Sequence, residues 1–205
     1  MNVFFSFLFP LLGYLSGSLP FSIWVTRYAK NVDVREAGSG HATTTNTIRQ
    51  AGFGWGALVA LLDLAKGFIP IYLALQVGQD AQSVLPYIVP LTAALAVAGH
   101  CWPVFAKFRG GMGLAPFAGA LLAVNWFAFL IGAGLLLALV LTIRHGARAS
   151  VLTGVLIAPL FWLLGLRGLE FWIALVCGLL IAYRFLIDWN RKYRELWLDR
   201  EKPGP

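Results

Sequence analysis

The chain has 205 residues, of which 59% are hydrophobic and only 12% are charged, and its mean hydropathy is +0.75. This composition excludes a soluble globular domain and indicates an integral membrane protein. The apolar runs are continuous and do not alternate with polar residues, so membrane-spanning helices are favoured over a β-barrel.

The apolar runs occur along the whole chain, and most have about the length that a bilayer requires of a helix. In chain order they cover about 3–25, 55–77, 84–105, 114–143, 150–164 and 170–187. The first run has small residues and no basic residue ahead of it, so we expect a retained helix and not a cleaved signal peptide. No linker or internal repeat is visible, and we expect one domain over 1–205.

The run over 114–143 is too long for one ordinary span and contains Asn125 near its middle. A break at Asn125 gives seven spans, and with an external N-terminus nearly all of the 16 basic residues lie on the cytoplasmic side. One unbroken helix would put whole basic clusters on the wrong side. We therefore predict an all-α membrane protein of about seven transmembrane helices, with a cytoplasmic C-terminus and Gly-rich cytoplasmic loops.

This topology places His41, His100 and His145 on the same cytoplasmic face as the polar loops. The net charge of +7 is concentrated there as well, where it would meet anionic lipid headgroups or a phosphorylated substrate. The alternative is that the charge only orients the protein in the membrane.

The loop over 38–49 is the most polar stretch of the chain. Its candidate binding residues are Ser39, Gly40, His41, Thr45, Asn46 and Arg49. Hydroxyl and amide groups bind hydroxyl and phosphate oxygens, and a guanidinium fork suits phosphate. The alternative is a solvated loop in which one of these side chains caps the next helix.

A second polar loop precedes the apolar run that begins at 114, and it contains Gly110, Gly111 and Gly113. Glycine lets successive backbone N–H groups turn toward one point, and a helix N-terminus adds partial positive charge. Lys107 and Arg109 lie close by. The pattern predicts a phosphate-binding loop, with an ordinary tight turn as the alternative.

Two ionisable residues, Asp63 and Lys66, lie within the second apolar run at a spacing that brings them together on a helix. Charges in lipid are costly unless they are paired or functional. Pairing alone explains them, and Lys66 could instead brace the cytoplasmic loops. Cys101 and Cys177 lie far apart, which indicates neither a zinc site nor a disulfide, and we expect both to be packing residues.

The order of these motifs resembles the bacterial acyl-phosphate:glycerol-3-phosphate acyltransferases of the PlsY type. The matching stretches are Gly-Ser-Gly with Thr-Asn and Arg after 38, Asp and Lys-Gly at 63–67, Gly-His at 99–100, Pro-Val-Phe with Phe-Arg-Gly-Gly-x-Gly over 103–113, and a basic loop ending in Ser150. The resemblance covers nearly the whole chain. The His and Asp spaced five apart, which acyl-CoA-dependent acyltransferases use, are absent.

The resemblance implies a seven-helix enzyme of the bacterial inner membrane with its site facing the cytoplasm. It implies transfer of a fatty acyl group from acyl phosphate to the sn-1 hydroxyl of glycerol 3-phosphate, giving lysophosphatidic acid and phosphate. The substrate's own phosphate is thought to assist deprotonation in that family, and neither coenzyme A nor a metal is required. Expected partners are the two substrates and membrane lipids, with no nucleic acid, and the oligomeric state stays open.

On this resemblance we expect catalytic roles for His100, Ser39 and Asn46. The residues expected to bind substrate or phosphate are Ser39, Gly40, His41, Thr45, Asn46, Arg49, Lys66, Lys107, Arg109, Gly110, Gly111, Gly113, Ser150 and Arg191.

The chain departs from the family pattern within the motifs themselves. The family usually has Asn at His41, Gly-Ala at Thr43-Thr44, Lys at Met112 and Thr at Pro116. The last motif of the family, His-Arg-x-Asn-x-x-Arg, is poorly matched over 185–191, where only Arg191 is clearly retained and Asp188 or Asn190 stands as a substitute. The absent lysine removes a cation from the expected phosphate loop, and a protonated His41 is one hypothesis for its replacement.

Three hypotheses follow from these departures. The first is an active glycerol-3-phosphate acyltransferase with an altered site. The second is a related membrane acyltransferase with another acceptor or donor. The third is a non-catalytic lipid-binding or regulatory homologue, or a transporter-like protein, although the midplane polar groups and repeats of a transporter are scarce here.

Overall fold

The computed structural model describes residues 3–77 and 85–191, and these are helical apart from short loops. The elements are α1 (Val3–Gly17), α2 (Phe21–Lys30), η1 (Val34–Glu36), α3 (Thr44–Ala51), α4 (Phe53–Val77), α5 (Leu85–Cys101), η3 (Val104–Ala106), α6 (Leu114–Val124), α7 (Trp126–Ile143), α8 (Gly146–Leu163) and α9 (Leu169–Leu186).

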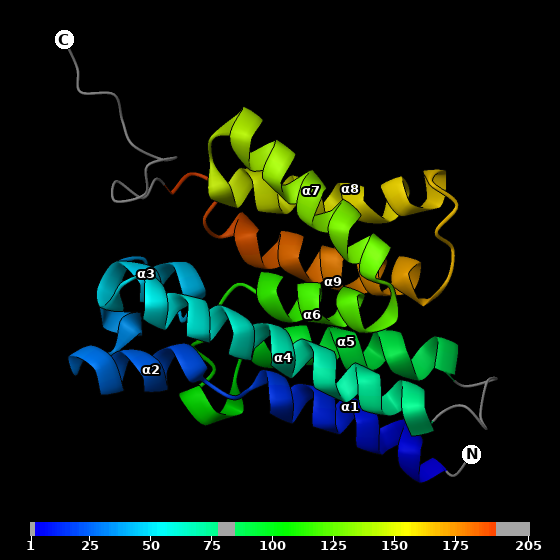
Figure 1. The fold of residues 1–205 in the computed structure, drawn as a ribbon, viewed down its shortest axis with the longest axis horizontal. Coiled ribbons are helices and arrows are strands. Elements are labelled where there is room, and N and C mark those ends of the chain that lie inside the picture. The colour runs from blue at the N-terminus through cyan, green and yellow to red at the C-terminus, as the bar shows by residue number, and fades with distance from the viewer. Residues whose placement is uncertain (1–2, 78–84, 192–205) are drawn as a thin grey trace.

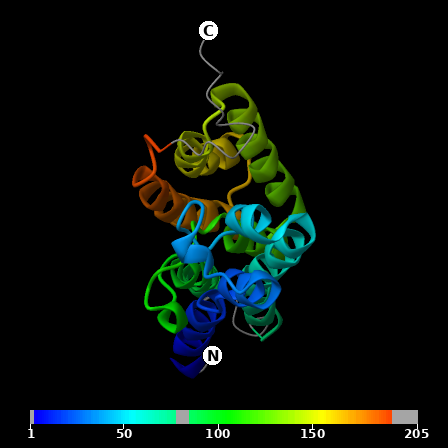
Figure 2. The same ribbon diagram turned by 90° about the vertical axis from the view of Figure 1, so that its left-hand side faces the viewer.

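The long helices lie side by side in one bundle, as Figure 1 shows. The short helices α2 and α3, the junction of α7 with α8 and the end of α9 gather at the left-hand end in that view. The N-terminus and the turn between α8 and α9 lie at the opposite end. Figure 2, which looks at the left-hand end, shows α3 in front of the bundle and α7 inclined along its side. The polar loops therefore gather at one end, as the charge pattern predicts.

Six stretches of the described chain are long and apolar enough to cross a membrane: α1 with α2, α4, α5, α7, α8 and α9. The predicted break at Asn125 is confirmed, because its backbone is extended and its side chain accepts hydrogen bonds from Phe127 N and Ala128 N to cap α7. The separated helix α6 has only 11 residues, or about 16 Å against a hydrocarbon layer of about 30 Å. Which end of the bundle faces the cytoplasm stays a prediction.

The first apolar run differs from the sequence prediction, because it does not form one continuous helix over 3–25. The helix α1 ends at Gly17 and α2 begins after Pro20, which has no N–H to continue the ladder. The break leaves backbone carbonyls without helical partners, and the ammonium of Lys66 donates to the carbonyl of Leu19 at 3.0 Å. Cys101 and Cys177 are buried and free, as expected of packing residues.

Close backbone contacts at glycine hold the helix pairs together. A Cβ atom placed on Gly178 of α9 would contact the carbonyl oxygen of Gly154 on α8 well inside van der Waals distance, and the reverse substitution meets the same obstacle. Gly67 of α4 faces the backbone of Pro116 on α6 in the same way. Small residues at such crossings are typical of membrane helices, because in lipid the helices associate through dispersion contacts and not through the hydrophobic effect.

We predict that Gly178→Ala destabilises the protein by about 1–3 kcal/mol, because the α8–α9 pair must separate to admit the methyl group. The matched control is Gly134→Ala on α7, where nothing lies within 4 Å of an added Cβ; alanine there should be neutral or gain up to about 1 kcal/mol. Thermal unfolding in detergent measures both. Equal shifts in the two variants would contradict the close-packing argument.

Candidate active site

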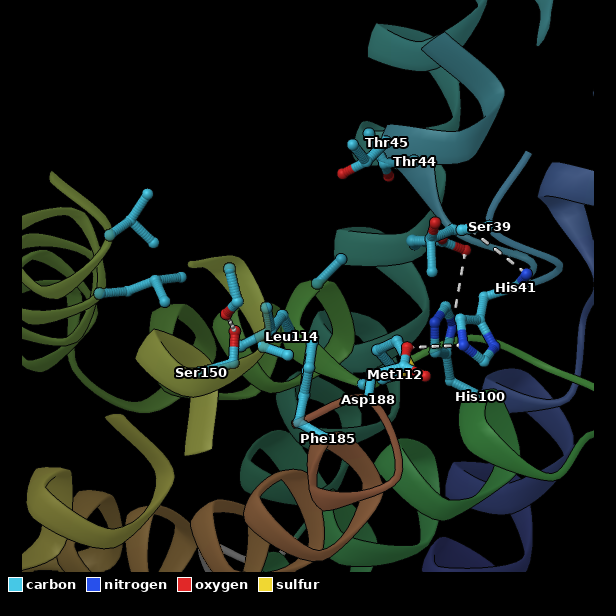
Figure 3. Close-up of a pocket in the computed structure, with 18 of the residues that line it drawn as sticks. Ser39, His41, Thr44, Thr45, His100, Met112, Leu114, Ser150, Phe185 and Asp188 are labelled. Carbon is cyan, nitrogen blue, oxygen red and sulfur yellow. Dashed lines mark hydrogen bonds and ion pairs between the residues drawn. The ribbon is translucent and has the colours of Figure 1, made fainter. Parts of the chain in front are cut away.

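A cavity of about 340 Å³ opens at the end of the bundle where the polar loops gather. Its wall is built from the loop before α3, from α3 to α8 and from the segment that ends α9. The lining residues are Ser39, His41, Thr43, Thr44, Thr45, Arg49, Asp63, His100, Met112, Gly113, Leu114, Ala115, Leu136, Val140, Gly146, Ala147, Ser150, Phe185 and Asp188. Figure 3 shows the polar residues Ser39, His41 and His100 on one side, with Ser150 and Leu114 on the other.

The loop that carries Ser39 and His41 is closed by the side chain of Asn46, which is fully buried. Its amide nitrogen donates to the carbonyls of Val34, Ala37 and His41 at 2.8, 3.0 and 3.1 Å, and its oxygen accepts from Ser39 N at 3.3 Å. These four hydrogen bonds satisfy backbone carbonyl and N–H groups of the loop that have no partner within a helix. Asn46, expected to be catalytic, lies behind the cavity wall and positions the loop.

The start of α3 supplies three of the threonine hydroxyls that line the cavity, those of Thr43, Thr44 and Thr45. Thr43 caps the helix by accepting from Asn46 N at 3.2 Å. Thr44 Oγ1 is buried in the cavity wall and has no hydrogen-bond partner among the described residues. A helix N-terminus with unused hydroxyl groups suits an anion, and Arg49, one turn further along the same helix, also lines the cavity.

Two buried charges lie beneath this polar end. Lys66 Nζ is 3.0 Å from Asp63 Oδ1, and both side chains are almost completely buried. Asp63 reaches the cavity but Lys66 does not. The ammonium of Lys66 donates to the carbonyl of Leu19, and the backbone carbonyl of Lys66 accepts from Ser16 Oγ. The bracing alternative for Lys66 therefore fits its contacts, because it ties α4 to α1 and to the break before α2.

The glycine-rich loop, predicted to cradle phosphate, makes contacts within the protein. Gly111 N donates to the carbonyl of His100 at 2.9 Å, and the carbonyl of Gly110 accepts from Ala42 N at 3.3 Å. An added Cβ at Gly111 would contact the imidazole Nε2 of His100. The loop thus clamps the His100 ring and the Ser39 loop, and only Gly113 of the three glycines lines the cavity.

A hydrogen bond joins two segments of the cavity lining that are far apart in the chain. His41 Nε2 is 2.8 Å from Asp188 Oδ2, as the dashed line in Figure 3 shows, and Asp188 is 3% exposed. Arg191 Nη1 lies 3.6 Å from the other carboxylate oxygen. The two substitutions at His41 and Asp188, which the sequence gives no reason to link, are therefore in contact.

Two predicted phosphate cations lie on the outer surface. Arg109 pairs with Glu36 at 2.9 Å, and both side chains are exposed, while Lys107 ends η3 in the left-handed conformation. Beside them, Asp33 accepts from Arg35, whose Nη1 also donates to the carbonyl of Ala106. The hydrogen bonds from Arg35 hold the pKa of Asp33 well below its usual range. This cluster fastens η1 to the second loop and does not enter the cavity.

The cavity thus brings together part of the predicted site. The predicted residues that line it are Ser39, His41, Thr45, Arg49, His100, Gly113 and Ser150. Those outside its lining are Gly40, Asn46, Lys66, Lys107, Arg109, Gly110, Gly111 and Arg191. Ser150 is buried on α8 and donates to the carbonyl of Gly146 at 2.9 Å.

One side of the cavity is polar and the other is apolar, and the cavity lies in a bundle of apolar helices. This arrangement and the sequence can be compared with known proteins. The sequence model of glycerol-3-phosphate acyltransferases matches residues 7–194. The chain belongs to this family. Glycerol-3-phosphate acyltransferase 2 of Thermotoga maritima is 37% identical over 157 residues, which cover 77% of this chain and 78% of the relative.

Solved structures of the family agree with the fold. The crystal structure of PlsY (YgiH), an integral membrane glycerol 3-phosphate acyltransferase, in its glycerol 3-phosphate form gives a TM-score of 0.79 at 31% identity, covering 98% of this chain and 96% of PlsY. Its lysophosphatidic acid form gives a TM-score of 0.75 at 30% identity, covering 91% and 90%. The resemblance to this family is confirmed over nearly the whole chain.

The resemblance implies an apolar groove for an acyl chain, but sequence reasoning named none of the residues in the apolar half of this cavity. Leu114, Leu136, Val140 and Phe185 line it from α6, α7 and α9. No local signal distinguishes the two α7 residues, because that helix is apolar on every side. Thr44 is not among the residues predicted to bind substrate; its position in the first turn of α3 is the signal that could have selected it.

We predict that Asn46→Asp destabilises the protein by about 1–3 kcal/mol, because a carboxylate cannot donate to the three carbonyls that the amide now satisfies. The control is Asn125→Asp, where the side chain only accepts hydrogen bonds and aspartate is an equally good cap. Thermal unfolding in detergent compares them. An Asn46→Asp variant as stable as the control would contradict the positioning role.

Proposed function

We propose that this protein is an acyltransferase that moves a fatty acyl group from acyl phosphate to the sn-1 hydroxyl of glycerol 3-phosphate, giving lysophosphatidic acid and phosphate. The observation that carries the proposal is the composition of the cavity, in which one wall offers hydroxyl and guanidinium groups and the other is apolar. A substrate with a phosphate at one end and an acyl chain at the other matches both walls. Membership of the glycerol-3-phosphate acyltransferase family supports the same reaction.

Phosphate would bind at the first turn of α3. The hydroxyls of Thr44 and Thr45, the helix N-terminus and the guanidinium of Arg49 form the polar wall beside Ser39. A planar guanidinium binds phosphate through two parallel hydrogen bonds, and the helix N-terminus favours negative charge. The hydroxyl of Thr44, buried without a partner among the described residues, is available for such an oxygen.

The acyl chain would lie against the apolar wall formed by Leu114, Leu136, Val140 and Phe185. Two of these residues belong to α7, which is largely exposed along its length and would face lipid. Burial of apolar surface contributes about 0.8 kcal/mol per methylene, so a long chain holds the donor in place. The reactive carbonyl would then lie between the apolar wall and Ser39.

The chemistry is well suited to a site without a metal or coenzyme. Acyl phosphate is a mixed anhydride with a good leaving group, so the acceptor hydroxyl forms the new ester bond while the bond to phosphate breaks. Holding the two reactants in contact is worth about 7–11 kcal/mol of barrier. Hydroxyl and guanidinium donors at the leaving phosphate stabilise the charge that develops there. We place the reaction on the cytoplasmic face of the bacterial inner membrane, on the basis of the basic loops at this end.

The decisive measurement is phosphate release from palmitoyl phosphate by the purified protein in detergent, with and without glycerol 3-phosphate. We expect release that depends on the acceptor, together with formation of lysophosphatidic acid. Release without an acceptor would indicate hydrolysis. Absence of any release would contradict the proposed donor.

The variant Met112→Lys tests the phosphate wall, since Met112 is 6% exposed and lines the cavity. An added ammonium there should lower the KM for glycerol 3-phosphate by roughly 10-fold or more, because a hydrogen bond to a charged group contributes about 1.5–3 kcal/mol. Lys30→Met, at the exposed end of α2, is the control and should leave KM unchanged. An unaltered KM in Met112→Lys would mean that phosphate binds away from this wall, and activity only in that variant would mean that the natural acceptor is a different one.

A further inference from the structure

We infer that Leu121 of α6 and Ile157 of α8, packed against Gly132 of α7, form a floor that limits the length of the acyl chain that the cavity accepts. This inference rests on the proposed acyl transfer, and it names the residues that select the donor by its chain length. All three residues lie outside the cavity lining, at the place where the three helices close beneath it.

The helices α6 and α7 form a V that opens toward the polar end of the bundle. The break at Asn125 joins them, and Figure 1 shows them diverging from this junction toward the end where α2 and α3 lie. Leu114 and Ala115 line the cavity from the open end of α6, and Leu136 and Val140 line it from α7. The cavity therefore occupies the open part of the V.

One face of α7 shows where the V closes. Ala128, Gly132, Leu136 and Val140 follow one another at the i, i+4 spacing, so they lie on the same face of the helix. Ala128 and Gly132 are buried, whereas Leu136 and Val140 are half-buried and line the cavity. The helix therefore packs against the bundle as far as Gly132 and separates from it beyond that residue.

Two buried side chains fill the closed part of the V. A Cβ atom placed on Gly132 would lie 2.9 Å from Cδ1 of Ile157 and 3.5 Å from Cδ1 of Leu121. Both side chains are almost completely buried. Because protein interiors are close-packed, a chain that reaches this point has no room to continue between the three helices.

The depth of the V suits a fatty acyl chain. From Ile143, the last residue of α7, to Gly132 the helix rises about 16 Å. One leaflet of the hydrocarbon layer is about 15 Å deep. A donor with its carbonyl at the polar wall has about this depth for its chain, and a longer chain would have to displace the side chains of Leu121 and Ile157.

The alternative is that a long chain leaves the cavity sideways, past α7 into lipid. The residues of α7 with the most exposed side chains, Leu137, Leu141 and Leu130, lie outside the cavity lining. The face that α7 presents to the cavity is the one that continues to Gly132. The helix thus stands between the cavity and the lipid, which favours a chain that runs along it to the floor.

The test measures kcat/KM for lauroyl, palmitoyl and arachidoyl phosphate, with glycerol 3-phosphate as the acceptor. A closed apolar site discriminates between chains that differ by a methylene by about 10-fold or more. Ile157→Ala removes part of the floor, so the ratio of kcat/KM for arachidoyl phosphate to that for palmitoyl phosphate should rise on the order of 10-fold. Gly132→Leu raises the floor, so the ratio for palmitoyl to lauroyl phosphate should fall by a similar factor.

The matched control is Gly134→Leu, which adds the same side chain to the same helix at a position where nothing lies within 4 Å of an added Cβ. Its donor preference should equal that of the unaltered protein. Thermal unfolding in detergent shows whether each variant is folded. If either floor variant is not, Ile157→Val and Gly132→Ala make smaller changes in the same two directions, and the same ratios should shift less but with the same sign.

Failure of this inference is distinguishable from failure of the proposed function. No acceptor-dependent transfer from any of these donors by the unaltered protein removes the proposed reaction, and the floor with it. Transfer by the unaltered protein, with donor ratios that do not change in the floor variants, overturns the floor alone and indicates that the chain leaves sideways. An equal loss of kcat/KM for all donors in folded variants also overturns it, and assigns these residues to packing.

Discussion

The lack of water in the hydrocarbon layer is the constraint from which the rest of this structure follows. Backbone N–H and C=O groups must be satisfied within each span, so the described chain is helical wherever it is apolar. Irregular backbone is tolerated only where protein side chains can satisfy it. The loop before α3 meets that condition through the single amide of Asn46, which makes four hydrogen bonds. The site is therefore confined to the end of the bundle.

The same constraint explains why charged residues occur inside the bundle. A lysine in a membrane helix needs a partner, and Lys66 has both Asp63 and the carbonyl of Leu19. The pair does more than neutralise charge, because Leu19 lies at the break between α1 and α2. Removing one member would leave the other buried without compensation. The charges thus fix the position of α1 and α2 against α4, which is the helix that carries Asp63 to the cavity.

Much of the fold follows from composition, since hydropathy gives the helices and the distribution of basic residues gives the break at Asn125. The residues that line the site are harder to obtain. Ser39 and Arg49, which the motifs select, line the cavity. Gly111 occurs in the same motifs but packs against His100. The position of a glycine in a motif does not indicate whether its backbone N–H already donates to another group of the protein. Which residues of α7 line the cavity depends on the inclination of that helix, and a uniformly apolar sequence does not predict this inclination.

The substitutions in the cavity make better sense together than singly. A carboxylate at Asp188 would repel a phosphate if it stood alone, because like charges at short range in a poorly solvated site are strongly unfavourable. The carboxylate does not stand alone, because His41 Nε2 donates to it at 2.8 Å and the guanidinium of Arg191 lies 3.6 Å from its other oxygen. Without the cation that a lysine at position 112 would supply, the polar wall relies on Arg49 and neutral donors such as Thr44. Under the proposed function, a wall of that kind would bind the phosphate less tightly in the ground state. The cavity thus has a polar wall that includes the guanidinium of Arg49, and a carboxylate, Asp188, whose charge lies against His41 and Arg191.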